Sequence, residues 1–194
     1  LFETSVGRLL FNTVLPDDFE YVNDEINTKR VMALIDELIM HYGFENMAKT
    51  LDKIKEFGYH YSTRSGITWG IDNVIVPVEK KAFVEKGMKE QDVVMTQYNE
   101  GLISEEEKYQ KLIEIWEKIR GEIEKILPDK IEKHGPYYDM IKSGARGSIG
   151  SLTQMAGMKG NIVNPSGKTI EYPVIPSFKE GLSPIQYFIT THGA

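Results

Sequence analysis

Hydrophobic residues recur at helical spacing in two neighbouring stretches of the first third of the chain. The first stretch runs from Thr28, a residue type that caps helices, to Gly43, a type that ends them. Its apolar positions share one helical face: Val31, Leu34, Ile35, Leu38 and Ile39. The second stretch ends at Gly58 and has a shorter apolar face: Met47, Leu51 and Ile54. We predict a packed pair of helices whose apolar faces form a core.

The most regular pattern, in residues 79–126, predicts a long antiparallel helical hairpin. Its second arm begins with Ser104 and Glu107, which have the spacing of a capping box. Apolar residues then follow alternating steps of three and four, as in a coiled coil: Tyr109, Leu112, Trp116, Ile119, Ile123 and Ile126. The first arm shows the same alternation: Val84, Met88, Gln91, Met95 and Tyr98. A turn at 99–101 would join the arms, each roughly 30–35 Å long at about 1.5 Å per residue, and Pro128 would end the hairpin.

The remaining segments carry weaker patterns. Extended structure is expected at three places: 8–15, 73–78 and 168–174. Other short elements are expected between them: a loop at 59–72, a helical piece at 151–155 and a turn at 164–167. Ser183 and Pro184 suit the start of a final helix that runs toward Ala194. The predicted fold class is therefore mainly α with irregular loops and short strands, in which a long antiparallel helical hairpin stands on a small helical body.

Composition acts mainly by exclusion. The chain has 194 residues, a net charge of −6 and no cysteine, which excludes disulfides and thiolate metal sites. No apolar run approaches the roughly 20 residues that span a membrane, and no signal peptide is recognisable at the start. Because the chain begins with Leu1 rather than Met, we expect a piece of a longer protein, and a cytoplasmic location fits the lack of cysteine. No basic patch marks an autonomous binder of duplex DNA.

The predicted tip of the hairpin is acidic. Residues 91–107 contain no Lys or Arg and five acids: Asp92, Glu100, Glu105, Glu106 and Glu107. Two interpretations are open. Acids in a first helical turn complement the helix dipole and are often simply solvated. The same charges would also form an electrostatic dock for a basic protein partner.

A glycine-rich stretch, residues 143–160, is the strongest candidate for a binding loop. It carries glycines at positions 144, 147, 150, 157 and 160, and a single arginine, Arg146, among small neighbours. Glycine lets a backbone bend closely around a ligand, and the planar guanidinium fork suits phosphate. On local chemistry alone, a surface loop with one solvated arginine is the favoured interpretation.

Several other chemistries are excluded. Gly167-Lys168-Thr169 lacks the first glycine of a nucleoside-triphosphatase loop, because Ile162 stands at that position. The histidines, at positions 41, 60, 134 and 192, have no zinc-motif spacing, so structural or surface roles are expected. No Ser-His-acid set is recognisable. No carboxylate cluster for two-metal phosphoryl transfer is present either.

Five ordered motifs together resemble the beta-prime subunit family of bacterial RNA polymerase. In chain order they are the segments 4–8, 64–72, 143–148, 154–160 and 181–194. The resemblance covers nearly the whole chain and implies a nucleotidyltransferase role in transcription. It also implies three parts: the end of a pore-type domain with the helix pair (1–58), a funnel-type domain with the hairpin 79–126 and the loop 143–167 (59–172), and the start of a bridge helix, truncated at the chain end (173–194).

The resemblance also implies roles for particular residues. Arg146 matches an arginine that meets the triphosphate of an entering nucleotide, and Gln154 lies in the same wall. Residues 155–167, which include Met158 and Lys159, match a loop that supports the bridge and trigger helices. Lys159 stands where family variants carry Arg, which keeps the charge but loses the planar fork. His192 falls at the start of the bridge helix, beside the nucleotide path.

Partners and cofactors follow from the same resemblance. The hairpin matches the rim helices of the secondary channel, where transcript-cleavage-type factors dock, so the five acids of the tip are the expected docking residues. Other polymerase subunits (beta, alpha, omega, sigma) and nucleoside triphosphates are expected partners, with DNA and RNA bound only in the full enzyme and no membrane contact. The family's Asn-Ala-Asp-Phe-Asp-Gly-Asp motif is absent, so Mg²⁺ would have its ligands outside this chain, which alone should be inactive. The alternative is a free-standing coiled-coil interaction protein.

Overall fold

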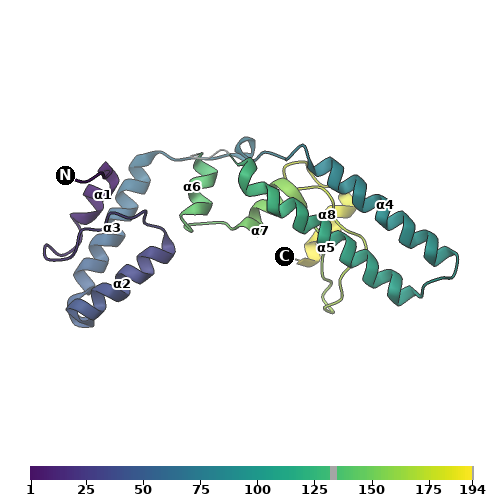
Figure 1. The fold of residues 1–194 in the computed structure, drawn as a ribbon, viewed down its shortest axis with the longest axis horizontal. Helices are drawn as coiled ribbons and strands as arrows, with labels where there is room; N and C mark the ends of the chain where they lie inside the picture. The colour runs from purple at the N-terminus through teal and green to yellow at the C-terminus, as the bar shows by residue number, and fades with distance from the viewer. Residues whose placement is uncertain (132–134, 194) are drawn as a thin grey trace. The chain divides into compact units, whose positions relative to one another are not determined.

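The computed structural model describes residues 1–131 and 135–193, and these residues are mainly helical (Figure 1). The chain forms two compact units. The first contains Leu1–Trp69 and Asp139–Arg146, and the second contains Gly70–Tyr138 and Gly147–Ala194. The predicted fold class, mainly α with a long helical hairpin, is confirmed. Extended pairing in the described part of the chain is limited to isolated antiparallel bridges, Gly160 with Val174 and Val163 with Thr169.

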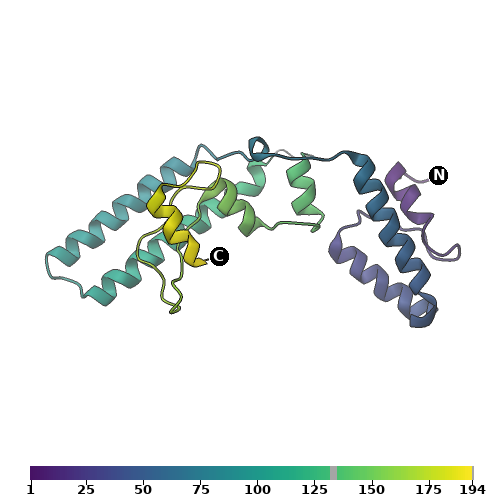
Figure 2. The same ribbon diagram turned by 180° about the vertical axis from the view of Figure 1, so that it is seen from behind.

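The first unit is a small helical body. It consists of α1 (Val6–Asn12), α2 (Thr28–Tyr42), α3 (Ala48–Ser65) and the last residues of α6 (Pro136–Lys142), with a 3₁₀ turn, Phe44–Asn46, between α2 and α3. Figure 2 shows α1, α2 and α3 grouped together. Their buried side chains make one core: Phe11, Leu15, Val22, Leu34, Leu38 and Met47. The predicted helix pair is therefore present, with α1 as a third member.

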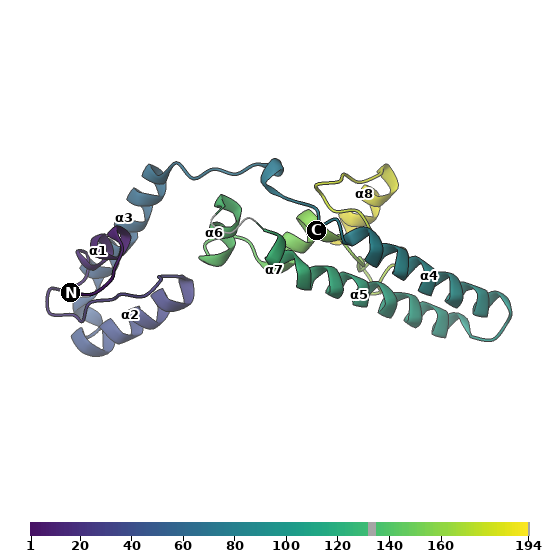
Figure 3. The same ribbon diagram turned by 45° about the horizontal axis from the view of Figure 1, so that its top comes forward.

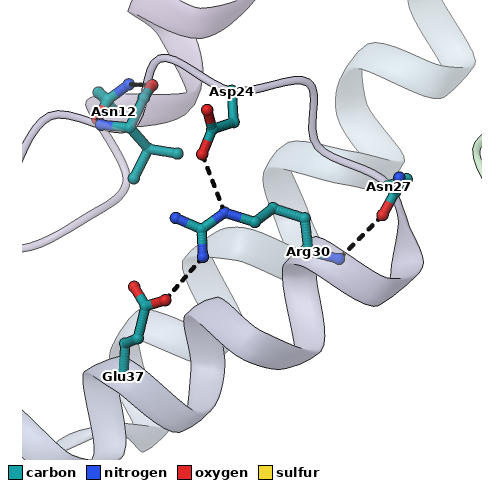
Figure 4. Close-up of polar contacts among 6 residues, drawn as sticks. Asn12, Asp24, Asn27, Arg30 and Glu37 are labelled. Carbon is teal, nitrogen blue, oxygen red and sulfur yellow. Dashed lines mark hydrogen bonds and ion pairs between the residues drawn. The ribbon is translucent and has the colours of Figure 1, made fainter.

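Polar contacts fix the entry to α2. Asn27, not Thr28, is the N-cap, because its side chain accepts a hydrogen bond from the Arg30 backbone N–H at 2.9 Å. The Arg30 guanidinium then joins the preceding loop to the helix: it pairs with Asp24 at 3.2 Å and with Glu37 at 2.7 Å (Figure 4). These carboxylates raise the pKa of Arg30, the hydrogen bond to Glu37 being the largest cause.

Two predictions for this unit are wrong. Residues 8–15 were expected to be extended, but residues 6–12 form α1, since its apolar residues pack on α2 and α3 and the Asn12 side chain bonds both backbone groups of Val22. The second helix was expected to end at Gly58 but continues to Ser65. A glycine ends a helix when it adopts a left-handed conformation. Gly66 does so, with a φ of +63°, whereas Gly58 stays helical.

The second unit is organised around the predicted hairpin. The arms α4 (Lys80–Asn99) and α5 (Glu105–Lys130) lie side by side and are joined by a short turn (Figure 3). The buried residues of α5 are Leu112, Trp116, Ile119, Ile123 and Leu127. Leu127 thus takes the core position that was predicted for Ile126. The helix also continues past Pro128, where the sequence predicted its end. Pro128 lies in the last turn of α5, so it interrupts few backbone hydrogen bonds of the helix.

The seam of the first arm differs from the predicted one. Gly87 and Val94 are buried, whereas Met88 is 46% exposed. The reason is the size of Trp116, whose ring occupies the space above Gly87. A Cβ at Gly87 would lie 3.2 Å from Trp116 Cζ3 and 3.0 Å from Ile119 Cγ1. The indole N–H donates a 2.8 Å hydrogen bond to Gln91 Oε1, so Gln91 faces the seam as predicted.

Short elements complete the second unit. They are a 3₁₀ turn (Ile71–Asn73), α7 (Ile149–Leu152), a π-helical turn (Thr153–Gly157), α8 (Pro184–Thr190) and a 3₁₀ turn (Thr191–Gly193). The expected helical piece at 151–155 and the turn at 164–167 are present, the latter closed by a Gly167 N–H to Asn164 O bond of 2.9 Å. Ser183 caps α8 in a capping box with Gln186.

Candidate functional site

The glycine-rich segment packs tightly on α5. Ser148 caps α7, since its hydroxyl accepts a 3.1 Å hydrogen bond from the Ser151 N–H. The π-helical turn then brings Gly157 against the second arm. A Cβ there would lie 2.8 Å from Ile123 Cγ2 and 3.1 Å from Leu127 Cδ1. Glycine is required at this position because the backbone itself contacts the helix.

Gly160 makes a second close approach to α5. Its φ is +88°, which favours glycine, and a Cβ would lie 2.8 Å from Arg120 Cδ. Two backbone hydrogen bonds with Val174, of 2.9 and 3.0 Å, pair it with the returning segment. The arginine is therefore held between its own helix and the backbone of Gly160.

Lys159 lies at the centre of a polar cluster. Its Nζ donates a 2.8 Å hydrogen bond to Gln154 Oε1 and lies 5.2 Å from the centre of the Phe178 ring. Burial lowers the pKa of Lys159, and the nearby charge of Arg120 lowers it further. Two of the residues predicted for the nucleotide path, Gln154 and Lys159, are thus brought together. Near Lys159 lie Arg120 and Phe178, which the sequence did not indicate.

Met158, the third predicted residue in this segment, is fully buried. Its N–H donates a 2.7 Å hydrogen bond to Thr153 O, which closes the π-helical turn. The side chain is part of the core of the second unit, so a support role suits it better than contact with a ligand.

Arg146 belongs to the first unit, and its side chain is exposed. It is flanked by Gly144, with a φ of +75°, and Gly147, with a φ of +84°. The Thr28 N–H and hydroxyl both donate to Ser143 O at 3.0 Å, which anchors this end of the loop on α2. The loop therefore presents the guanidinium to solvent, as the sequence predicts.

The three histidines within the described residues have separate surroundings. His192 is exposed in the last 3₁₀ turn, and His134 lies outside the described residues. Of the two in the first unit, His41 packs on Tyr42 and His60 on Tyr61. Within residues 1–131 and 135–193, no group of three or more His, Asp or Glu side chains is placed to hold a metal ion.

The acidic tip surrounds the turn of the hairpin. Glu100 is the C-cap of α4, Gly101 has a φ of +74°, and α5 begins at Glu105. All five acids are exposed, and none forms an ion pair with another described residue. Beside them Leu102 is 69% exposed. The tip therefore combines exposed negative charge with an exposed apolar side chain.

One of the five acids has a clear structural role. Glu107 accepts a 2.8 Å hydrogen bond from the Ser104 N–H and a 2.9 Å bond from its hydroxyl, while the Glu107 N–H donates to Ser104 Oγ at 3.2 Å. These hydrogen bonds from Ser104, the backbone one first, lower the pKa of Glu107. The predicted capping box is confirmed, and the Glu107 carboxylate is engaged in hydrogen bonds with Ser104 at the start of α5.

Sequence reasoning missed two groups of this unit. Arg120 is one, and no local pattern distinguishes it from a solvated helix residue. The other is the ion pair of Lys80 with Glu180. Lys80 is only 5% exposed and donates to the Glu180 carboxylate. The same carboxylate accepts hydrogen bonds from the Ser177 N–H at 2.8 Å and from the Ser177 hydroxyl at 2.7 Å. Burial alone would raise the pKa of Glu180, but the hydrogen bonds from Lys80 and Ser177 outweigh it and lower the pKa.

In the described ranges, no helix has both the length and the apolar character needed to cross a membrane.

Comparison with known proteins finds two family models along the chain. Residues 1–74 match the family described as RNA polymerase Rpb1, domain 3, and residues 89–187 match RNA polymerase Rpb1, domain 4. The second match covers about half of the chain and includes most of the hairpin, the glycine-rich segment and the start of α8.

Curated relatives agree with these models. The chain is 41% identical over 192 residues to the DNA-directed RNA polymerase subunit beta' of Pelotomaculum thermopropionicum, and 43% identical over 191 residues to that of Heliobacterium modesticaldum. The corresponding subunit of Kineococcus radiotolerans is 43% identical over 192 residues. These alignments cover 98–99% of this chain but only 15–16% of each relative.

Proposed function

Because this chain belongs to the RNA polymerase Rpb1 family, we propose that it works in transcription as part of a DNA-directed RNA polymerase. The observation that carries this proposal is the match to domains 3 and 4 in sequence order, 1–74 followed by 89–187. The nucleotidyltransferase activity would belong to the whole enzyme, since the chain spans about a sixth of the length of its curated relatives.

Within that enzyme, the chain would shape the path by which nucleotides enter. The exposed guanidinium of Arg146 would meet the triphosphate, and Gln154, Lys159 and His192 would line the path. The resemblance of residues 155–167 and 181–194 to the loop behind the bridge helix and to the bridge helix itself supports this assignment. Met158 would support the loop from within the core.

The hairpin would dock transcription factors that bind in the secondary channel. Its support is the exposed acidic tip, which forms no ion pair with other described residues and carries the exposed Leu102. Such a surface suits a basic partner with an apolar contact, because charge complementarity speeds association and selects the partner. Asp92, Glu100, Glu105 and Glu106 would make the contacts, and Glu107 would keep α5 in place.

The other partners follow from the assembly. The beta, alpha, omega and sigma subunits would surround this chain in the cytoplasm. The catalytic Mg²⁺ would be held by carboxylates outside residues 1–194, so the chain by itself would be inactive. Nucleic acid would be bound only in the full enzyme, which agrees with the net charge of −6.

Immunopurification from the source cells tests the proposal. An antibody raised against the 194-residue chain should retain a complex that contains the other polymerase subunits, identified by mass spectrometry, and that synthesises RNA on a DNA template. The same antibody saturated with the purified chain serves as the control. Recovery of the protein without polymerase subunits or activity would contradict the proposal and favour the free-standing interaction protein.

A further inference from the structure

Arg120 and Lys159 are two neighbouring cations without an anionic partner. In the part of the chain that the structure describes, neither forms an ion pair with a carboxylate. Arg120 lies against Gly160, and Lys159, the residue before Gly160, lies beside Phe178. Like charges that are half-buried together destabilise each other. A pair of this kind is normally retained only when something compensates the charge.

The Arg120 side chain offers a donor that is not satisfied within the described residues. Its Nε is buried and has no hydrogen-bond partner among residues 1–131 and 135–193. Buried N–H groups are almost always satisfied, so each exception calls for an unseen acceptor such as an ion or a water molecule. Gly160 confines this side chain, since a Cβ there would lie 2.8 Å from Cδ and 3.4 Å from Nε, which holds Arg120 against the residue that follows Lys159.

The donors of this cluster complement one another. Lys159 is a point charge and cannot offer a planar fork, whereas Arg120 supplies such a fork from α5. Gln154 uses its Oε1 to accept from Lys159, and its Nε2 donates to no acceptor among the described residues. Arg120 Nε and Gln154 Nε2 thus lack an acceptor among the described residues, and Lys159 keeps N–H donors beyond the one that it gives to Gln154.

We propose that Arg120, Lys159 and Gln154 form an oxyanion site for a phosphate group. A phosphate carries a charge of about −1.5 to −2 at neutral pH, which matches the two cations better than a single carboxylate does. It also has enough oxygens to accept from the guanidinium, the ammonium and the amide together. The Phe178 ring, 41% exposed, forms the adjoining apolar wall.

Two sources share this chemistry: the phosphates of a nucleotide, and free phosphate or pyrophosphate. The site adds a phosphate-binding position to the proposed nucleotide path. Only the identification of a nucleotide as the natural ligand rests on the proposed function. The oxyanion itself can be tested on the 194-residue chain, whereas the transcription role is tested on the complex from cells. Failure of one is therefore distinguishable from failure of the other.

The test is a titration of the full chain, followed by NMR of the arginine Nε–H and lysine Cε signals. Sodium phosphate, pyrophosphate and ATP are added separately at constant ionic strength. We expect saturable shifts of the Arg120 and Lys159 signals and a rise in the pKa of Lys159, because a bound anion favours its charged form. Tighter binding of ATP than of pyrophosphate would identify a nucleotide as the source, and the reverse would identify the free anion.

Variants decide whether the site is specific. Arg120→Gln should weaken phosphate binding about tenfold or more, as expected for loss of a charge-assisted hydrogen bond. Arg120→Lys keeps the charge and should still weaken binding, because the fork is lost. Lys125→Gln removes a charge from an exposed position of the same helix and should change nothing. Circular dichroism spectra of the variants check that the fold is retained.

Three outcomes would overturn the proposal. One is a set of shifts that grow linearly with phosphate and are equal at Arg120 and at the exposed Arg64, which would indicate nonspecific screening. Another is unchanged phosphate affinity in folded Arg120→Gln. The third is an Arg120 Nε–H signal that is insensitive to every anion, which would indicate that water satisfies the group.

Discussion

Gly87 of α4 lies directly against the indole of Trp116 on α5. A Cβ at position 87 would approach Cζ3 of the ring to 3.2 Å, and the indole N–H donates to Gln91 one turn further along α4. The packing of the two arms at this point therefore depends on a residue without a side chain facing the largest side chain of the seam.

Gly87→Ala should destabilise the chain by about 1–2 kcal/mol, because the added methyl overpacks the seam. Gly121→Ala is the matched control: Gly121 is also inside a hairpin helix, and a Cβ there meets nothing within 4 Å. That change should instead stabilise by about 0.5–1 kcal/mol through helix propensity. Urea unfolding followed by far-UV circular dichroism measures both, and equal effects of the two changes would contradict the packing argument.

Gly160→Ala should destabilise more than Gly167→Ala. Both glycines have positive φ, +88° and +82°, so alanine at either position is strained by about 1–2 kcal/mol. Only at position 160 would the methyl also meet a side chain, with Arg120 Cδ at 2.8 Å, whereas position 167 is open. The difference between the two free energies of unfolding isolates the contact with α5, and a difference of zero would mean that Arg120 moves aside freely.

Glu180 should make the second unit sensitive to acid. Its pKa lies below its ordinary value of 4.5, so its contribution to stability is complete above about pH 4.5 and is lost as the pH falls through its folded-state pKa. Glu180→Gln should cost about 1–2 kcal/mol at neutral pH, the low end for hydrogen bonds to charged groups, because the carboxylate is 37% exposed. The variant should lose less stability than the parent on acidification.

Unfolding free energies at pH 7, 5 and 3 provide this comparison. Glu117→Gln, at an exposed position of α5, is the control and should leave the pH profile unchanged. Parallel profiles for the parent and for Glu180→Gln would show that the ion pair with Lys80 does not contribute to the acid sensitivity.

Arg146→Ala in the complete polymerase should raise the KM for nucleoside triphosphates about tenfold, because a charge-assisted hydrogen bond to phosphate is lost. Arg146→Lys should have an intermediate effect, since the charge remains without the fork. Single-nucleotide addition at a series of nucleotide concentrations measures both. Elongation kinetics identical to those of the parent enzyme would remove Arg146 from the nucleotide path.

Reversing charge at the hairpin tip should slow factor docking. Glu100→Lys together with Glu105→Lys should lower the association rate of a basic channel-binding factor at least about tenfold at low salt, and the effect should shrink as salt is added. Glu114→Lys makes a similar change on α5 outside the tip and serves as the control. Stopped-flow association rates that respond equally to all three positions would assign the effect to net charge instead of to the tip.

Local signals explain what could be predicted. The hairpin, the capping box at Ser104, the N-cap at Ser183 and the stop at Gly43 all involve residues within a few positions of one another, and the structure has them as predicted. The strand expected at 8–15 and the helix end expected at Gly58 failed because contacts outside these segments, and the conformation of Gly66, decided them. Of the candidate site, the sequence indicated the loop and the acidic tip but neither Arg120 nor Phe178.

The sequence by itself therefore determined the helix pair, the hairpin and its capping box, the start of the last helix, the acidic tip and the family, because periodicity, capping and ordered motifs are properties of short stretches. Only the tertiary structure decided that Gly87 faces Trp116, that Lys80 is buried against Glu180 and that Arg120, which lies against Gly160, is near Lys159. The physical reason is that these partners are 29, 100 and 39 positions apart in the chain. At such separations a contact depends on how whole elements pack, and no local pattern encodes it.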